Sequence, residues 1–214
     1  MGAINEIVKF YQEGGEFMHP ILLVMAIGVA IAIERVLYLS LARAHNRRTW
    51  NQLLPLLQQG KFHDARQLAE QTNAAIGKVL SYGLARMNAG REQMELAMEE
   101  GLMEVTPRLE KRTHYLATLA NIATLLGLLG TIIGLISAFS SISLANPNEK
   151  AQLLSSSISV AMNTTAFGLM VGIPLLLVHA FLQSKTNQLI SSLETAAIKL
   201  ANSIKDRPSL QEAA

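Results

Sequence analysis

The sequence predicts an all-α integral membrane protein with three transmembrane helices. Half of its 214 residues are hydrophobic and only 16% are charged, whereas about a quarter of the residues of a soluble domain are charged. Three long stretches contain no Asp, Glu, Lys or Arg, namely residues 17–33, 113–148 and 151–184. A bilayer core of about 30 Å is crossed by roughly 20 helical residues, so each stretch can form a span.

These stretches divide the chain into seven segments. We expect an outer segment at 1–17, spans at 18–41, 114–144 and 152–183, a helical cytoplasmic domain at 42–113, an outer loop at 145–151 and a cytoplasmic tail at 184–214. At about 1.5 Å per residue, the second and third uncharged stretches would each reach roughly 50 Å. The helices that contain them must therefore extend beyond the hydrocarbon layer.

The Lys and Arg residues predict the orientation. Residues 42–113 contain eleven of them, whereas the first 17 residues have only Lys9 and the second outer segment has only Lys150. Because positive residues stay in the cytoplasm, we expect the N-terminus outside and the C-terminus inside. Glu34 and Arg35 then lie at the inner rim, where we expect them to pair with each other or to extend towards water.

The segments outside the spans read as helices. Residues 49–71 predict two short helices broken at Gly60, and the stretch from Arg91 to Ser143 predicts one long helix that Pro107 kinks. In the outer segment, apolar residues at positions 4, 7, 8 and 11 share one helical face. This pattern predicts a short amphipathic helix on the outer membrane surface.

Small residues recur at three- and four-residue steps along the second and third spans. In lipid, such stripes let helices pack closely, because small side chains allow their backbones to approach. The glycines expected to pack helices in this way are Gly127, Gly130, Gly134, Gly168 and Gly172.

Three threonines fall at one depth between these glycines. Thr131 lies 16 residues before Pro147, the expected tip of the outer hairpin, and Thr164 and Thr165 lie 17 and 18 residues after it. Antiparallel helices that leave one tip reach equal depth at equal residue count, here near the middle of the bilayer. The hydroxyls either only support packing or line a hydrated, cation-accepting spot.

Several classes of function find no support in the sequence. The chain has no cysteine, and we find no Ser-His-Asp set, paired carboxylates or phosphate-binding loop, so we expect neither an enzyme nor a metal or cofactor site. The net charge of +2 gives no indication of nucleic-acid binding. No carboxylate lies within the second or third span, so any acidic group on an ion pathway would come from a partner chain.

Three motifs, in order, resemble the MotA/TolQ/ExbB family. They are "GGEFMHPILLVMAIGVAIAIERVL" at 14–37, "LANIATLLGLLGTIIGLISAF" at 119–139 and "ISVAMNTTAFGLMVGIP" at 158–174. Together they cover the family's three spans, and the three-span arrangement resembles ExbB and TolQ more than the four-span flagellar stator MotA.

The resemblance implies a homo-oligomeric ring, a pentamer, in the bacterial inner membrane. The ring surrounds a dimer of single-span partners of the ExbD/TolR/MotB type, whose aspartate carries H⁺ or Na⁺. Ion flow then drives mechanical work across the envelope, for example TonB-like transport. By motif position, Thr131 and Thr165 correspond to pore-facing hydroxyls, with Thr164 beside them.

Two positions depart from the family pattern. Val160 stands where ExbB and TolQ carry a glutamate, and Thr124 stands where they tend to carry proline. The missing glutamate leaves H⁺ and Na⁺ open as the transported ion, since hydroxyl and carbonyl oxygens can coordinate Na⁺. A passive membrane scaffold and a component of a small-solute transporter are the alternative functions, although three spans without an internal repeat are few for a transporter.

Overall fold

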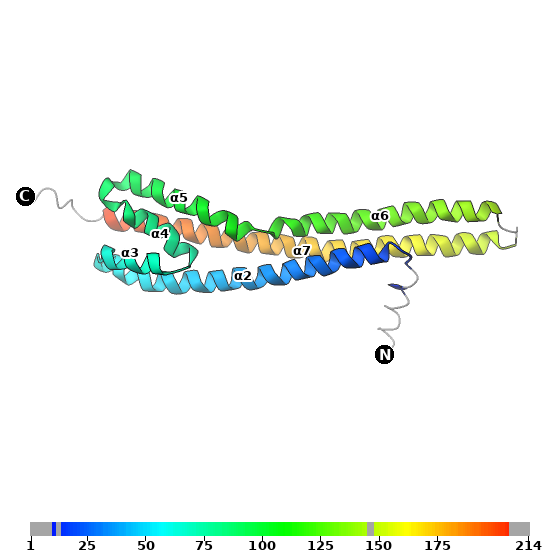
Figure 1. Ribbon diagram of the computed structural model, residues 1–214, viewed down its shortest axis with the longest axis horizontal. Helices are drawn as coiled ribbons and strands as arrows, with labels where there is room; N and C mark the ends of the chain where they lie inside the picture. The colour runs from blue at the N-terminus through cyan, green and yellow to red at the C-terminus, as the bar shows by residue number, and fades with distance from the viewer. Residues whose placement is uncertain (1–9, 12–13, 145–147, 206–214) are drawn as a thin grey trace, which may run out of the picture. The chain divides into compact units, whose positions relative to one another are not determined.

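The computed structural model describes residues 10–11, 14–144 and 148–205, and this part of the chain consists of helices and the turns between them (Figure 1). In order, the helices are α2 (Met18–Gln59), α3 (Phe62–Gln71), α4 (Ala75–Ala85), the short 3₁₀ helix η1 (Met87–Ala89), α5 (Arg91–Glu110), α6 (Thr113–Leu144) and α7 (Lys150–Lys205). The all-α class is confirmed.

The chain divides into two compact units. The membrane unit comprises the residues up to Glu34 together with Arg112–Phe181, and the polar unit comprises Arg35–Lys111 and the residues from Leu182 onward. The helices α2 and α7 contribute to both units. The helices α3, α4 and α5 lie in the polar unit, and α6 lies in the membrane unit.

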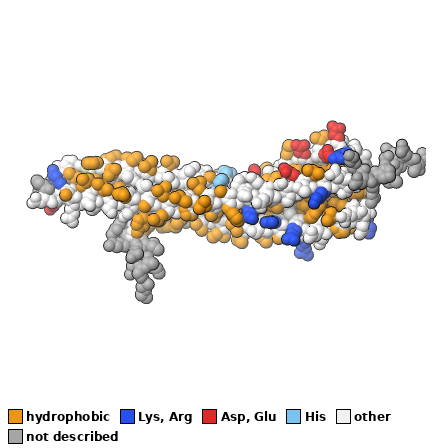
Figure 2. Space-filling view, turned by 180° about the vertical axis from the view of Figure 1, so that it is seen from behind, with side chains coloured by type: hydrophobic (Ala, Val, Ile, Leu, Met, Phe, Trp, Pro, Cys, Tyr) orange, Lys and Arg blue, Asp and Glu red, His pale blue; other side chains and the backbone are white. Residues whose placement is uncertain are grey.

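Apolar side chains cover the outside of the membrane unit. On the face drawn in Figure 2 they run along its helices, whereas most of the charged side chains gather on the polar unit. Three helical stretches are long and apolar enough to cross a membrane, namely Met18–Gln59, Arg91–Ser143 and Lys150–Ile204, and most of this apolar length is not buried within the chain. Such a surface is stable in lipid rather than in water.

The first long helix does not end near Leu41. It continues to Gln59, so the short helix that the sequence predicted before Gly60 is wrong as a separate element. The break at Gly60 itself is confirmed, since α3 starts at Phe62. Gly60 has a φ of +74°, a backbone conformation that glycine adopts without steric cost.

The long helix expected between Arg91 and Ser143 is divided by a turn. The helix α5 ends at Glu110 and α6 begins at Thr113. Between them Arg112 has a φ of +64°, the one positive φ outside glycine among the described residues. The chain therefore leaves the helical conformation here and re-enters it two residues later.

A side chain from α2 satisfies the end of α5. Pro107 lies inside α5 and has no N–H to donate, so the last turn of this helix is already short of hydrogen bonds. The buried guanidinium of Arg35 donates a hydrogen bond to the carbonyl of Leu109. This bond replaces one that a continuing helix would have made.

In the polar unit, α4 and α5 pack closely and are linked by polar side chains. A Cβ on Gly101 would lie 3.1 Å from the Cα of Val79. The Glu104 carboxylate accepts hydrogen bonds from Lys78 and from the Tyr82 hydroxyl, the latter at 2.8 Å. The Lys78 hydrogen bond is the main cause that lowers the pKa of Glu104, and the bond to Glu104 raises the pKa of Tyr82.

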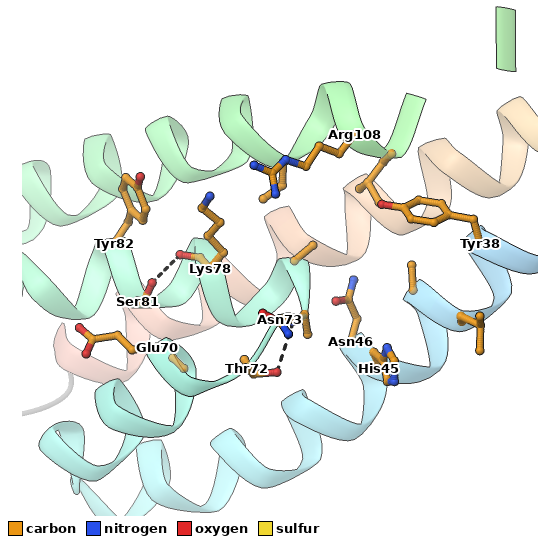
Figure 3. A pocket seen from close by; sticks show the side chains of 17 residues that line it. Tyr38, His45, Asn46, Glu70, Thr72, Asn73, Lys78, Ser81, Tyr82 and Arg108 are labelled. Atoms are coloured by element: carbon orange, nitrogen blue, oxygen red, sulfur yellow. Dashed lines mark hydrogen bonds between the residues drawn. The ribbon is translucent and has the colours of Figure 1, made fainter. Parts of the chain in front are cut away.

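A cavity of about 610 Å³ lies between α2, α4 and α5 in this unit (Figure 3). Tyr38, Asn46, Lys78 and Arg108 are among the residues that line it. The buried Asn46 accepts a hydrogen bond of 3.2 Å from the backbone N–H of Ile76. This bond fixes the first turn of α4 against α2, because the residue before α4 provides no side-chain cap.

The amphipathic helix expected at 4–11 falls mostly outside the described residues. Phe10 and Tyr11 are described, and both rings meet the ring of Phe167 edge-on, with centroids 6.4 and 6.2 Å apart. The Tyr11 hydroxyl lies 2.6 Å from Nδ1 of His19. These two residues therefore pack against the start of α2 and against α7.

Candidate ion-pathway site

The helices α6 and α7 approach each other through backbone contacts at glycine. A Cβ on Gly168 would lie 2.7 Å from the carbonyl oxygen of Ala123 and 3.0 Å from the Cα of Gly127. One on Gly172 would lie 3.0 Å from the carbonyl oxygen of Ala120. Real Cβ atoms do not approach backbone this closely, so a larger residue would push the helices apart.

The other two glycines of the predicted set also lie at close contacts. A Cβ on Gly134 would lie 3.1 Å from that of Ala161. One on Gly130 would lie 3.1 Å from the Cβ of Thr164 and 3.2 Å from that of Phe17. Gly130 thus makes room for α7 and for the start of α2 together.

Thr131 on α6 and Thr165 on α7 form a hydrogen-bonded pair through their hydroxyls. The Thr165 hydroxyl also lies 2.9 Å from the carbonyl oxygen of Gly127. The Thr131 hydroxyl lies 3.3 Å from the carbonyl oxygens of Gly127 and Ala161. Two hydroxyls and two carbonyl oxygens therefore gather at one level, which is the level that counting residues from Pro147 predicts for this pair.

Thr164 takes a different place from the other two threonines. Its side chain is only 2% exposed, and its hydroxyl lies 2.6 Å from the carbonyl oxygen of Gly14 and 3.0 Å from that of Val160. Gly14 immediately precedes α2, so Thr164 fastens this segment to α7. Its hydroxyl is turned to the start of α2 rather than to Thr131.

The Thr131–Thr165 pair interrupts an otherwise apolar surface. Both side chains are half-buried. One turn before each threonine stands an exposed apolar residue, Leu128 at 51% and Met162 at 64%. One turn after Thr165, Leu169 is exposed as well. The pair is therefore a small group of oxygen atoms that an ion or water can reach within a hydrocarbon-like face.

Val160, where the family pattern has a glutamate, lies on the same side of α7 as Thr164. Its Cγ1 would be 3.2 Å from a Cβ on Gly15. A longer side chain here would press against the segment before α2 rather than reach Thr131. Neither Gly14 nor Gly15 was singled out from the sequence, where their only signal is the glycine pair that opens the first motif.

Glu34 and Arg35 do not pair with each other. Within the membrane unit, Glu34 accepts a hydrogen bond of 2.8 Å from the Arg112 guanidinium. Within the polar unit, the buried Arg35 donates to the carbonyl of Leu109, and its guanidinium lies 4.7 Å from the centre of the Tyr38 ring. The expectation that these neighbours pair or extend to water is wrong for Arg35, because its charge is enclosed by protein groups.

Three apolar helices and a glycine-lined contact between two of them define a multi-pass helical membrane protein. A family model described as the MotA/TolQ/ExbB proton channel family matches residues 71–195, which run from the last residue of α3 into α7. The chain belongs to this family. It is a family of channels and not of enzymes.

Individual relatives agree with the family assignment. The chain is 32% identical to the putative biopolymer transport protein ExbB-like 1 of Synechocystis, over 83% of this chain and 71% of that protein. It is 26% identical to the biopolymer transport protein exbB1 of Vibrio cholerae, over 80% and 76% of the two chains. It is 23% identical to the putative ExbB homolog of Methanothermobacter thermautotrophicus, over 88% and 67%.

Proposed function

We propose that this chain is the ion-conducting subunit of a membrane motor. With a single-span partner of the ExbD/TolR/MotB type, it couples inward flow of H⁺ or Na⁺ to mechanical work across the cell envelope. The observation that carries the proposal is the Thr131–Thr165 pair, a hydrogen-bonded group of oxygens on an apolar face of α6 and α7. Family membership supports the same function.

The partner would supply the charge that moves. The sequence has no Asp or Glu between Arg112 and Asn148, nor between Lys150 and Lys185. Hydroxyl and carbonyl oxygens alone offer a cation hydrogen bonds and partial charges but no titratable group. An aspartate on the partner helix, brought against Thr131 and Thr165, would bind the ion, and the hydroxyls would help to exchange it with water.

Several copies would form the pathway together. We propose a ring of five, with α6 and α7 of each copy facing the partner dimer and with the polar unit in the cytoplasm. The biopolymer transport named for the relatives from Synechocystis and Vibrio cholerae favours a TonB-like transport process as the work performed. Either ion is compatible with the oxygen groups at the Thr131–Thr165 pair.

The test is ion flux in liposomes that contain the chain with and without its partner. We expect flux only when both proteins are present. In Na⁺-free, K⁺-substituted buffer at constant pH, full activity that a protonophore abolishes would identify H⁺, and loss of activity would identify Na⁺. Absence of flux in every buffer would contradict the proposal and favour a passive scaffold. Solute-dependent flux without the partner would favour a small-solute transporter.

A further inference from the structure

The part of α2 in the polar unit carries an exposed basic face. Arg43, Arg47 and Arg48 are exposed on the side of the helix away from its buried residues Asn46 and Leu53. Among the described residues no ion pair involves these arginines. Three unpaired positive charges on one helical stripe are therefore available to an outside partner.

The helix α5 carries an exposed acidic face with apolar residues in it. This helix contains six Glu and two Arg. Its outward stripe includes Glu92, Glu99 and Glu100, for which no ion pair is found among the described residues. Between these acids stand Leu96 and Met103, which are 52% and 67% exposed. Apolar side chains two turns apart, rimmed by charge, are typical of a protein contact surface.

The two faces lie at the same height in the polar unit. The contact of Arg35 with the Leu109 carbonyl fixes α2 and α5 at one level. From it the helices run in opposite chain directions, so the basic face begins 8 residues after Arg35 and ends 13 after it. The acidic stretch Leu96–Met103 lies 6 to 13 residues before Leu109. At about 1.5 Å per residue, both faces span roughly 10 to 20 Å from that contact.

The faces point in different directions. In Figure 1, α5 and the end of α2 follow opposite edges of the polar unit. In the space-filling view of Figure 2, acidic side chains gather at one edge of this unit and basic ones at the other. One copy therefore cannot join its own two faces. Copies that cross the same membrane in the same direction bring the acidic face of one beside the basic face of the next, without any shift in height.

We propose that the basic face of one copy binds the acidic face of a neighbouring copy of this chain, head to tail. Leu96 and Met103 would pack beside Ala44, which is exposed between the arginines, and the glutamates would pair with the arginines. Anionic lipid fits less well, because the arginines lie about 12 to 20 Å further along α2 than Arg35. A head-to-tail contact repeats from copy to copy and can close into a ring. The proposal does not depend on ion conduction.

Introduced thiols test the contact directly, because the native chain has no cysteine. Full-length chains that carry either Ala44→Cys or Met103→Cys are co-expressed in one membrane and treated with a short bifunctional thiol cross-linker. We expect a cross-linked dimer of one chain of each kind. The control replaces Ala44→Cys with Gln58→Cys, which is exposed on the same helix but about 21 Å further along it. It should give no product.

Charge reversal tests the cause of the contact. We expect the pair Arg43→Glu and Arg47→Glu to lower the cross-linking yield about tenfold or more, since like charges would then face each other. Glu99→Arg and Glu100→Arg on the other face should do the same, and all four changes together should restore the yield.

Three results would overturn the proposal. They are no cross-link in the mixture, cross-linking of Ala44→Cys chains with one another, and failure of the fourfold variant to recover. Circular dichroism of the purified variants checks that each is folded. Because cross-linking needs neither partner nor ion gradient, these outcomes are separate from the flux measurement.

Discussion

The membrane unit and the polar unit pack their helices by different means. In the membrane unit, α6 and α7 meet backbone to backbone at glycines, and threonine hydroxyls provide the side-chain hydrogen bonds between them. In the polar unit, α4 and α5 also approach at a glycine, but Lys78, Tyr82 and Glu104 add charged hydrogen bonds. The surroundings explain the difference, because lipid does not drive apolar helices together and close packing must do so instead.

The same residue type therefore has opposite meanings in the two units. Leu193 is fully buried in the polar unit, as expected for a core residue in water. Leu125 in α6 is largely exposed, as expected for a residue that faces lipid. Burial within one chain thus measures the importance of an apolar residue in the polar unit and says little about it in the membrane unit.

Glycine substitution should have the largest effect. Gly168→Ala places a methyl group against the Ala123 carbonyl, which cannot move aside, and we expect destabilisation of about 3 kcal/mol. The matched change in the polar unit, Gly101→Ala, meets Val79 at a longer distance and should cost about 1 kcal/mol. Thermal unfolding of the two purified variants compares them. Equal losses would show that the two units tolerate close packing alike.

The second prediction concerns Arg35 in the polar unit. Arg35→Ala removes the donor to the Leu109 carbonyl and leaves a buried acceptor unsatisfied, which should destabilise the protein by about 2 kcal/mol. Arg66 is exposed and pairs only with Glu70 one turn away among the described residues, so Arg66→Ala should change stability by less than about 0.5 kcal/mol. Denaturant unfolding distinguishes them, and a similar small loss in both would mean that Arg35 is not needed to finish α5.

The Thr131–Thr165 pair should affect ion flux more than stability. The double variant Thr131→Val and Thr165→Val keeps the shape of both side chains, so its unfolding free energy should change by only about 1 kcal/mol. We expect partner-dependent flux to fall at least about tenfold, because the oxygens are lost. Thr118→Val is the control, since Thr118 is exposed and bonds only to its own helix. Normal flux in the double variant would leave these threonines as packing residues.

The smallest effect should come from Glu104. Its pKa is lowered by the hydrogen bond from Lys78 and then by that from Tyr82, so the contacts stabilise the folded protein while the carboxylate is ionised. This stabilisation is present above the unfolded pKa and is lost as the pH falls through the lower, folded value. Glu104→Gln should remove that part of the acid dependence of unfolding. An unchanged pH profile would mean that the contacts add nothing measurable in water.

The sequence was most informative where the signal is local. Hydropathy over single stretches located the three apolar helices, and counting from Pro147 located the level at which Thr131 meets Thr165. Both depend on chain length and composition alone. The end of α2 was misjudged because residues 42–59 are polar on one face and apolar on the other, so the helix could continue after the apolar stretch ended.

Contacts between distant residues could not be read in the same way. Thr164 and Thr165 are neighbours with identical side chains, yet Thr164 bonds to Gly14, 150 residues earlier in the chain. Nothing in the spacing of the threonines separates them, because their difference comes from how the start of α2 packs on α7. The partner of Arg35 was missed for the same reason, as the acceptor is a backbone carbonyl.

The turn between α5 and α6 also has an electrostatic consequence. Two helices in place of one create a new partial negative charge at the end of α5 and a new partial positive charge at the start of α6. Adjacent residues of α2 match these two ends: the cation Arg35 meets the Leu109 carbonyl, and the anion Glu34 meets Arg112, next to the first turn of α6. Each favourable charge contributes about 0.3–1 kcal/mol at a helix end. The acid–base order of this dipeptide therefore lowers the energy of the break, and the reversed order Arg-Glu would raise it.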